Sequence, residues 1–119
     1  LYEAGVKFCI SASSSTFEAA HQRSLPYEAA MAISYGLPLI EGLKSITLSA
    51  AEILGVDEYI GSLEKGKSAT IFISDGDPLL FDTKVLSAYI DGRKVDMNDR
   101  HKMLRDKYLE KYKQLNIIE

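Results

Sequence analysis

The stretch Gly61-Ser62-Leu63-Glu64-Lys65-Gly66-Lys67-Ser68, followed by Ala69-Thr70-Ile71-Phe72-Ile73-Ser74, decides how this chain folds. Its first eight residues match the phosphate-binding pattern G-x-x-x-x-G-K-[ST], in which amides at a helix N-terminus face the anion. The next six alternate and are rich in β-branched residues, which predicts a strand where that pattern needs a helix. We therefore expect a β-turn that enters a strand, and nucleotide binding through residues 61–68 remains an alternative.

The β-like pattern continues on the C-terminal side of this stretch. Residues 75–78 (Asp-Gly-Asp-Pro) predict a turn, and residues 85–90 and 93–95 predict two more strands. Asp91-Gly92 lies between these strands and predicts a type I′ hairpin, because both central residues of that turn need positive φ.

The tail from Asn98 onward predicts a helix, with Asn98 or Asp99 as the N-cap. Its apolar residues form a stripe at helical spacing: Leu104, Tyr108, Tyr112 and Leu115. Residues 99–113 hold six Lys or Arg against three Asp or Glu, a net charge of +3. We expect a solvated helix that lies back on a more acidic body, with contact to nucleic acid or a membrane as the alternative.

Helices are also predicted on the N-terminal side. Ser24 and Pro26 suit the first turn of a helix over residues 25–35, which Gly36 then ends. Residues 39–54 carry apolar side chains at helical spacing up to Gly55, which predicts one helix or two short ones with a break near Ser49.

Residues 6–10 (Val-Lys-Phe-Cys-Ile) predict a buried strand that leads into a serine-rich loop. Loops at the exits of parallel strands carry the chemistry of α/β folds. A Ser/His pair with His21 could provide a nucleophile and its base, although no G-x-S-x-G elbow surrounds these serines. We keep His21 and Arg23 as candidates and expect Cys9 to be an inert core thiol.

Length and composition narrow the class of protein. The 119 residues are about half of the roughly 250 that a complete (β/α)₈ barrel needs. With 46% hydrophobic and 26% charged residues we expect a compact soluble fold with a modest core, and the net charge of −3 argues against nucleic acid as a partner. A single Cys and no long apolar run favour a cytoplasmic protein without disulfides or membrane spans, and the start at Leu1 favours a piece of a longer chain.

Several segments, in this order and spacing, resemble the C-terminal signature of the metal-dependent amidohydrolase superfamily, especially its imidazolonepropionase-like members. The resemblance covers about residues 4–95 and rests on Gly5-Val6-Lys7-Phe8, Leu25-Pro26-Tyr27-Glu28-Ala29-Ala30, Leu54-Gly55-Val56-Asp57, residues 60–67, Gly76-Asp77-Pro78-Leu79 and residues 90–95.

This resemblance implies an α/β fold in which the chain is the C-terminal fragment of a (β/α)₈ amidohydrolase barrel. Residues 1–55 would form the last β/α portion of the TIM-like barrel, 56–97 strands of the flanking β-sandwich, and 98–119 a C-terminal helix. The parent would hydrolyse non-peptide C–N bonds of cyclic or linear amides with a metal-activated water, whose pKa the metal lowers. The fragment by itself would be inactive.

The resemblance also implies what this chain lacks. The family's Asp after the last barrel strand falls near Ser13, and a neutral hydroxyl is a poor general base. No Asp occurs between Gly5 and Asp57, so we expect no catalytic or metal-binding residue here and no cofactor on this chain. A divalent metal such as zinc is expected only if the parent is an active enzyme, and a non-catalytic scaffold is the alternative. Expected partners are the remainder of the parent barrel or a second copy that associates through exposed edges.

Overall fold

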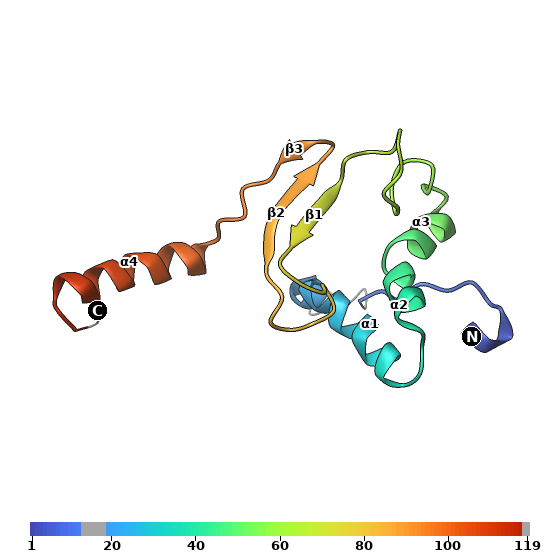
Figure 1. Cartoon of the computed structure of the whole chain (residues 1–119), viewed down its shortest axis with the longest axis horizontal. Helices are drawn as coiled ribbons and strands as arrows, with labels where there is room; N and C mark the ends of the chain where they lie inside the picture. Colours follow the sequence, from blue (N-terminus) through green and yellow to red (C-terminus); the bar gives the residue numbers. More distant parts are fainter. Residues whose placement is uncertain (13–18, 118–119) are drawn as a thin grey trace.

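A helical layer and a small antiparallel sheet lie next to each other, and a long C-terminal helix extends away from both (Figure 1). This computed structural model describes residues 1–12 and 19–117. Two short 3₁₀ helices, η1 (Tyr2–Ala4) and η2 (Ala19–Ser24), precede the helical layer. The described part of the chain is thus α/β, with its strands all antiparallel.

Helix α1 (Leu25–Ser34) begins and ends at the signals that predict it. Pro26 lies in the first turn, where its missing N–H costs no hydrogen bond. At the other end Gly36 has a φ of 104°, and the Leu37 N–H donates to the Ala32 carbonyl at 3.1 Å. This Schellman-type cap reverses the chain toward the next helix, which packs on α1.

The apolar stretch 39–54 forms two short helices, α2 (Leu39–Ser45) and α3 (Leu48–Leu54). The break lies at residues 46–47, close to the expected position. Thr47 Oγ1 donates to the Leu43 carbonyl at 2.7 Å, and the buried Ser45 Oγ donates to the Gly42 carbonyl at 2.7 Å. Such hydroxyl bonds to the preceding turn, together with a β-branched pair, favour an interruption over a continuous helix.

The sheet follows the predicted β pattern. Strands β1 (Ile71–Ser74), β2 (Val85–Ile90) and β3 (Arg93–Lys94) lie in the order β1-β2-β3. Asp91 and Gly92, with φ of 48° and 75°, join β2 to β3, which confirms a turn with two positive φ values.

Residues 6–10 do not form the predicted strand. No strand among the described residues pairs with them, and one backbone bond, from the Ile10 N–H to the Ser45 carbonyl at 3.1 Å, ties this segment to α2. A strand needs a neighbour for its backbone groups, and a sequence pattern cannot supply one. Cys9 is correspondingly exposed, so its assignment to a buried core was wrong.

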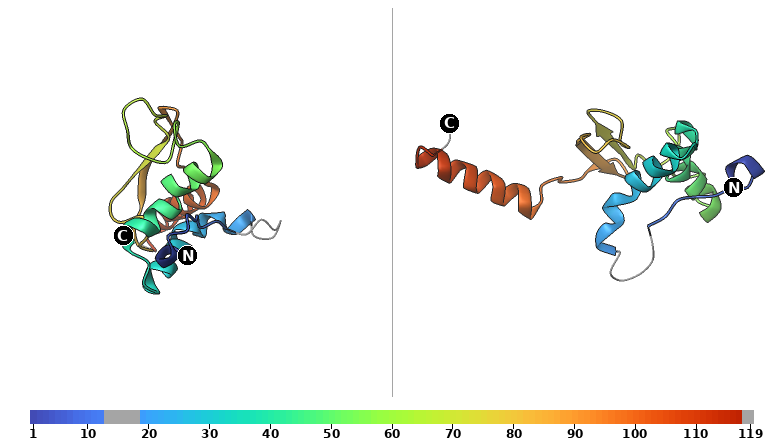
Figure 2. Two further views of the ribbon diagram at one scale, coloured as in Figure 1. Left: turned by 90° about the vertical axis from the view of Figure 1, so that its right-hand side faces the viewer. Right: turned by 90° about the horizontal axis from the view of Figure 1, so that it is seen from below.

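Helix α4 (Arg100–Gln114) is capped by Asp99, whose carboxylate accepts the Lys102 N–H at 2.9 Å. It contacts no other helix or strand of the described chain, and it lies apart from the body in Figure 1 and in the right-hand view of Figure 2. The expectation that it lies back on the body was therefore wrong. Residues 95–99, which are irregular, lead it away from the sheet. None of the described helices is both long enough and apolar enough to cross a membrane.

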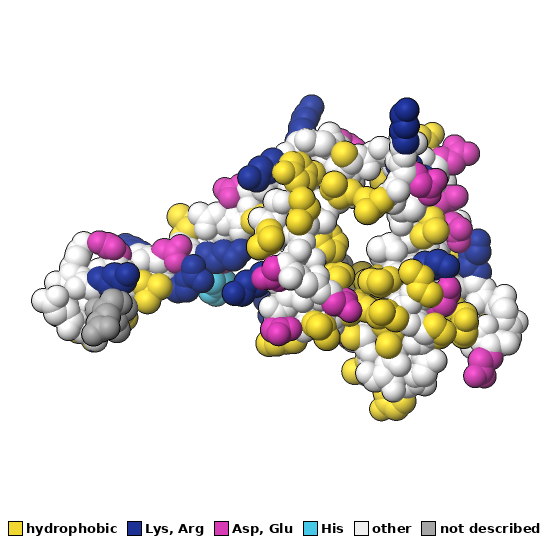
Figure 3. Space-filling model, in the orientation of Figure 1, with side chains coloured by type: hydrophobic (Ala, Val, Ile, Leu, Met, Phe, Trp, Pro, Cys, Tyr) yellow, Lys and Arg dark blue, Asp and Glu magenta, His cyan; other side chains and the backbone are white. Residues whose placement is uncertain are grey.

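The hydrophobic core is much smaller than the composition predicts. Among the side chains whose burial the structure describes, the buried apolar ones are Ala29, Ala51 and Leu79, and many large apolar side chains are exposed, several of them gathered on the face shown in Figure 3. The accessible surface is 9682 Å², whereas a compact protein of 13.2 kDa exposes about 6400 Å². The radius of gyration is 18.1 Å, against about 13.5 Å for a compact chain of this length. The expected compact fold was therefore wrong: helices and sheet form an open body joined by loops.

Candidate functional site

In the loop with the phosphate-binding pattern, the side chains of Ser62, Glu64 and Lys67 bond to one another. Lys67 Nζ donates to Ser62 Oγ at 2.6 Å and lies 3.2 Å from Glu64 Oε1, and Ser62 Oγ donates to the same carboxylate. The Ser68 N–H donates to the Tyr59 carbonyl at 2.8 Å. The cation and amide that would face a phosphate are thus already bonded within the chain.

The charge state of this loop follows from these contacts. The Ser62 hydroxyl, followed by the Lys67 ammonium, holds the pKa of Glu64 below its ordinary value. The loop therefore keeps a carboxylate where a phosphate would lie. Strand β1 begins at Ile71, and no helix begins at Lys67. The geometry contradicts the nucleotide-binding alternative.

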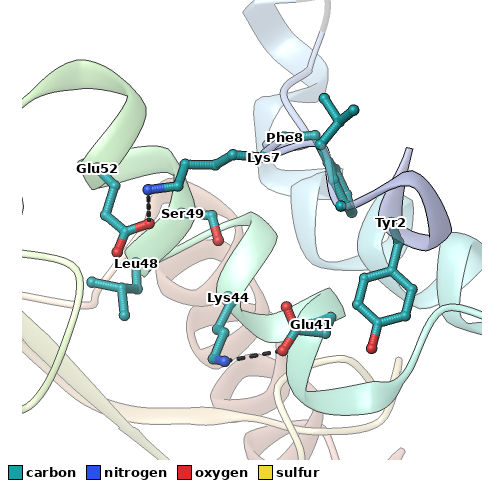
Figure 4. A pocket seen from close by; sticks show the side chains of 10 residues that line it. Tyr2, Lys7, Phe8, Glu41, Lys44, Leu48, Ser49 and Glu52 are labelled. Atoms are coloured by element: carbon teal, nitrogen blue, oxygen red, sulfur yellow. Dashed lines mark hydrogen bonds and ion pairs between the residues drawn. The ribbon is translucent and has the colours of Figure 1, made fainter.

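A polar groove lies where the N-terminal segment crosses α2 and α3 (Figure 4). It has a volume of about 340 Å³. Lys7 reaches across it to Glu52 of α3 at 2.9 Å, and Lys44 pairs with Glu41 of α2 at 3.0 Å. Tyr2 and Ser49 complete its polar lining.

The side chains of this groove serve to position the N-terminal segment, and they offer few groups suited to catalysis. Both ion pairs are partly exposed to solvent, and pairs near the surface contribute about 0–1 kcal/mol each. Among the side chains that the structure describes, no His or Cys lines it, so none of them offers Ser49 a base. The ion pair between Lys7 and Glu52 ties residues 5–8 to α3, and the charges of the groove are neutralised in pairs.

The structure describes only part of the predicted site. Ser13 lies outside the described residues, as do the serines that follow it. His21 and Arg23 lie on η2, and Arg23 is exposed and forms none of the ion pairs found within residues 1–12 and 19–117. Arg23 does not line the polar groove.

A divalent metal does not fit the side chains that the structure describes. Within residues 1–12 and 19–117, no three His, Cys, Asp or Glu side chains approach one another closely enough to share an ion. Catalytic zinc takes three protein ligands and leaves one position for water. No metal-dependent step can therefore be assigned to the described residues.

An apolar cavity of about 490 Å³ lies between α3, the loop 56–63 and the start of β1. Its lining includes Ala50, Leu54, Ile60 and Phe72. Gly61 lets the loop approach α3 closely there, with a φ of 96°. The cavity has the character of an open packing surface, since Leu54 and Phe72 are 75% and 52% exposed.

Sequence reasoning missed both hollows. The spacing of Glu41 and Lys44 on one helix is a local signal for their ion pair. The pairing of Lys7 with Glu52 joins segments that are distant in the chain, and no local pattern indicates it.

Comparison with known proteins gives a consistent result. The sequence model described as the Amidohydrolase family matches residues 1–106. The chain is 37% identical over 65 residues to the amidohydrolase tasK of Hapsidospora irregularis, which covers 55% of this chain and 7% of that protein. It is 44% identical over 45 residues to an imidazolonepropionase of Sphingopyxis alaskensis, covering 37% of this chain and 11% of that protein.

A solved structure is similar as well. The crystal structure of an amidohydrolase from Thermotoga maritima MSB8 superposes with a TM-score of 0.60 at 36% identity, over 63% of this chain and 20% of that one. The chain thus spans a fifth or less of the length of each of these three proteins.

Proposed function

This chain belongs to the amidohydrolase family, and we propose that it is the C-terminal portion of a protein that hydrolyses non-peptide C–N bonds in cyclic or linear amides. The match of the family model to residues 1–106 carries the proposal. The small share of each relative that the chain spans supports its being a portion of a longer protein.

In this proposal residues 1–55 contribute the last β/α part of a barrel, and residues 56–97 contribute strands to a neighbouring sandwich. The unpaired segment 6–10 would gain a neighbour in the rest of the barrel. The exposed apolar side chains of the helical layer, Leu39, Ile40 and Ile53 among them, would be covered there too.

The chain by itself would be inactive. A metal in the whole protein would lower the pKa of a bound water and make it a nucleophile at neutral pH. Its ligands would come mostly from other parts of the protein, because the described residues do not fit a metal. This chain's own role would be to complete the barrel wall and to anchor it to the sandwich.

A non-catalytic scaffold is the second candidate function. It is favoured by one observation: no Asp occurs between Gly5 and Asp57, and Ser13 falls near the position where the family has one. A serine hydroxyl cannot take a proton from water near neutral pH as a carboxylate can.

The test compares the 119-residue chain with the full-length protein. Metal content and hydrolysis of a panel of cyclic and linear amides are measured for both. We expect metal and turnover in the full-length protein and neither in the 119-residue chain. Turnover by the 119-residue chain would contradict the proposal.

The scaffold alternative predicts a metal-free, inactive full-length protein. In that case Ser13→Asp in the full-length protein tests whether restoring the carboxylate restores hydrolysis.

A further inference from the structure

Helix α4 has no part in the barrel or the sandwich of the proposed function, which use residues 1–55 and 56–97. The family model ends at residue 106, so most of α4 lies beyond the segment that the family shares. It contacts no other described helix or strand, and it stands apart from the body in Figure 1. The surface of this helix is therefore open to an outside partner.

One face of α4 is apolar. Leu104, Tyr108, Tyr112 and Leu115 follow one another at spacings of three and four residues, so they form one stripe on a helix with about 3.6 residues per turn. All four are between 40% and 56% exposed. Tyrosine, with an apolar ring and a polar hydroxyl, is enriched where water meets the hydrocarbon of a bilayer.

Basic side chains border this stripe, and acidic ones lie opposite it. Arg100, Lys107 and Lys111 form the row next to the stripe, at spacings of seven and four residues. They form none of the ion pairs found within residues 1–12 and 19–117, so the described chain does not engage their charges. Asp106 and Glu110, one turn apart, lie on the face turned away from the stripe.

This arrangement of charge suits an anionic lipid surface. A helix that lies in the plane of a bilayer buries its apolar side, and long basic side chains at the border reach the phosphate headgroups. Acidic side chains on the far face stay in water.

A second copy of α4 and nucleic acid both fit less well. Residues 99–113 carry a net charge of +3, so two such helices repel each other, and Lys111 would occupy a core position of the heptad that includes Leu104, Tyr108 and Leu115. Nucleic acid offers phosphates, but it would leave the apolar stripe in water.

We propose that α4 is a membrane-surface anchor, which lies flat on bilayers that contain anionic phospholipids. Its apolar stripe enters the headgroup region, and Arg100, Lys107 and Lys111 contact lipid phosphates. Residues 95–99 separate it from the rest of the chain, whose net charge is negative. The inference does not depend on the hydrolase activity.

Co-sedimentation with vesicles measures the binding. The 119-residue chain and the full-length protein are each mixed with vesicles of phosphatidylcholine alone, or of equal parts phosphatidylcholine and phosphatidylglycerol. Both proteins should bind the anionic vesicles, and added salt should weaken this binding, because it screens the attraction between the helix and the headgroups. Vesicles of phosphatidylcholine alone should bind much less of either protein.

Two matched pairs of substitutions test the face that contacts the lipid. Lys111→Gln removes a cation at the border of the stripe and should weaken binding about fivefold. Lys113→Gln removes the same charge from the far side of the helix, about 10 Å farther from the lipid, where salt screens it, and should have a much smaller effect. Leu104→Gln should weaken binding on the order of tenfold, whereas Met103→Gln, at the neighbouring residue that points away from the stripe, should change it little. Circular dichroism checks that each variant keeps the helix.

Four results would overturn the proposal. The first is a 119-residue chain that does not bind anionic vesicles, and the second is an equal loss within each matched pair, which would indicate attraction to a basic segment without a defined face. The third is binding to duplex DNA in place of vesicles, which would indicate a nucleic-acid contact. The fourth is binding by the 119-residue chain but not by the full-length protein, which would show that the rest of the protein covers α4. None of these results bears on whether the full-length protein holds a metal or hydrolyses amides.

Discussion

Gly61 is the residue at which the loop before the sheet touches the helical layer. Its φ is 96°, and a Cβ built there would lie 2.7 Å from the Ala51 Cβ and 3.1 Å from the Leu48 Cα. We predict that Gly61→Ala lowers the free energy of unfolding by about 2–3 kcal/mol, through backbone strain plus overpacking. Urea denaturation measures the loss.

Gly66 provides a matched control for this substitution. Its φ is 99°, and a Cβ there meets nothing within 4 Å. Gly66→Ala should therefore cost only the backbone term, about 1 kcal/mol. Equal losses at the two glycines would contradict the close packing of Gly61 on α3.

The Glu64 carboxylate links the stability of the same loop to pH. The Ser62 hydroxyl and then Lys67 lower its pKa in the folded chain, so its contribution is fully present above the ordinary pKa of 4.5. The contribution is lost as the pH falls through the lower, folded pKa. We predict that both Ser62→Ala and Lys67→Met raise the pKa of Glu64, as measured by NMR titration of its carboxyl carbon. An unchanged pKa in both variants would contradict the contacts described here.

At the scale of the element, α4 is a helix without tertiary support. Helices without packing depend on their caps and on local pairs. Asp99 supplies the N-cap, and its pKa is lowered, chiefly because its carboxylate accepts the Lys102 N–H.

We predict that Asp99→Ala destabilises α4 and reduces the helical signal at 222 nm in circular dichroism, because the first turn loses its N-cap. Asp99→Ser keeps an N-capping oxygen and should retain most of the signal. In the unsubstituted chain the cap is strongest above the ordinary pKa of the aspartate and weakens as the pH falls through the lowered one. A helical signal that is the same in all three chains would contradict a role for the cap.

The elements that sequence could predict are those with local signals. Gly36, Gly55 and the Asp91-Gly92 turn lie where the sequence places them, because positive φ and capping are properties of a few neighbouring residues. The prediction of a strand over residues 6–10 was wrong, because a strand forms only where a second strand pairs with it, and a local pattern does not show whether one is present. The separation of α4 from the body could not be predicted either, since it depends on where residues 95–99 lead the chain.

The same reasoning applies to the candidate site. Gly61 and Lys67 match the phosphate-binding pattern G-x-x-x-x-G-K-[ST]. The strand that follows them, where that pattern needs a helix, indicates instead a turn that enters a sheet. The groove between Lys7 and Glu52 depends on a contact between segments that are distant in the sequence, so no local sequence pattern predicts it. Ser13, the position on which the catalytic question depends, lies outside the described residues.

At the scale of the whole molecule, the open arrangement sets the dimensions in solution. We predict a radius of gyration near 18.1 Å by small-angle X-ray scattering, extrapolated to zero concentration so that association does not contribute. A variant that ends after Val95 lacks α4 and should have a distinctly smaller value. A value near 13.5 Å for the 119-residue chain, expected for a compact chain, would indicate that α4 packs on the body.

The irregular segment 95–99 has a practical consequence for purification and storage. It is largely exposed, and Lys94 and Arg100, both trypsin sites, flank it. Proteases cut most readily at exposed, irregular backbone. A brief digestion should therefore release α4 as a peptide before the body is degraded, and any preparation stored without inhibitors should show this clipped form first.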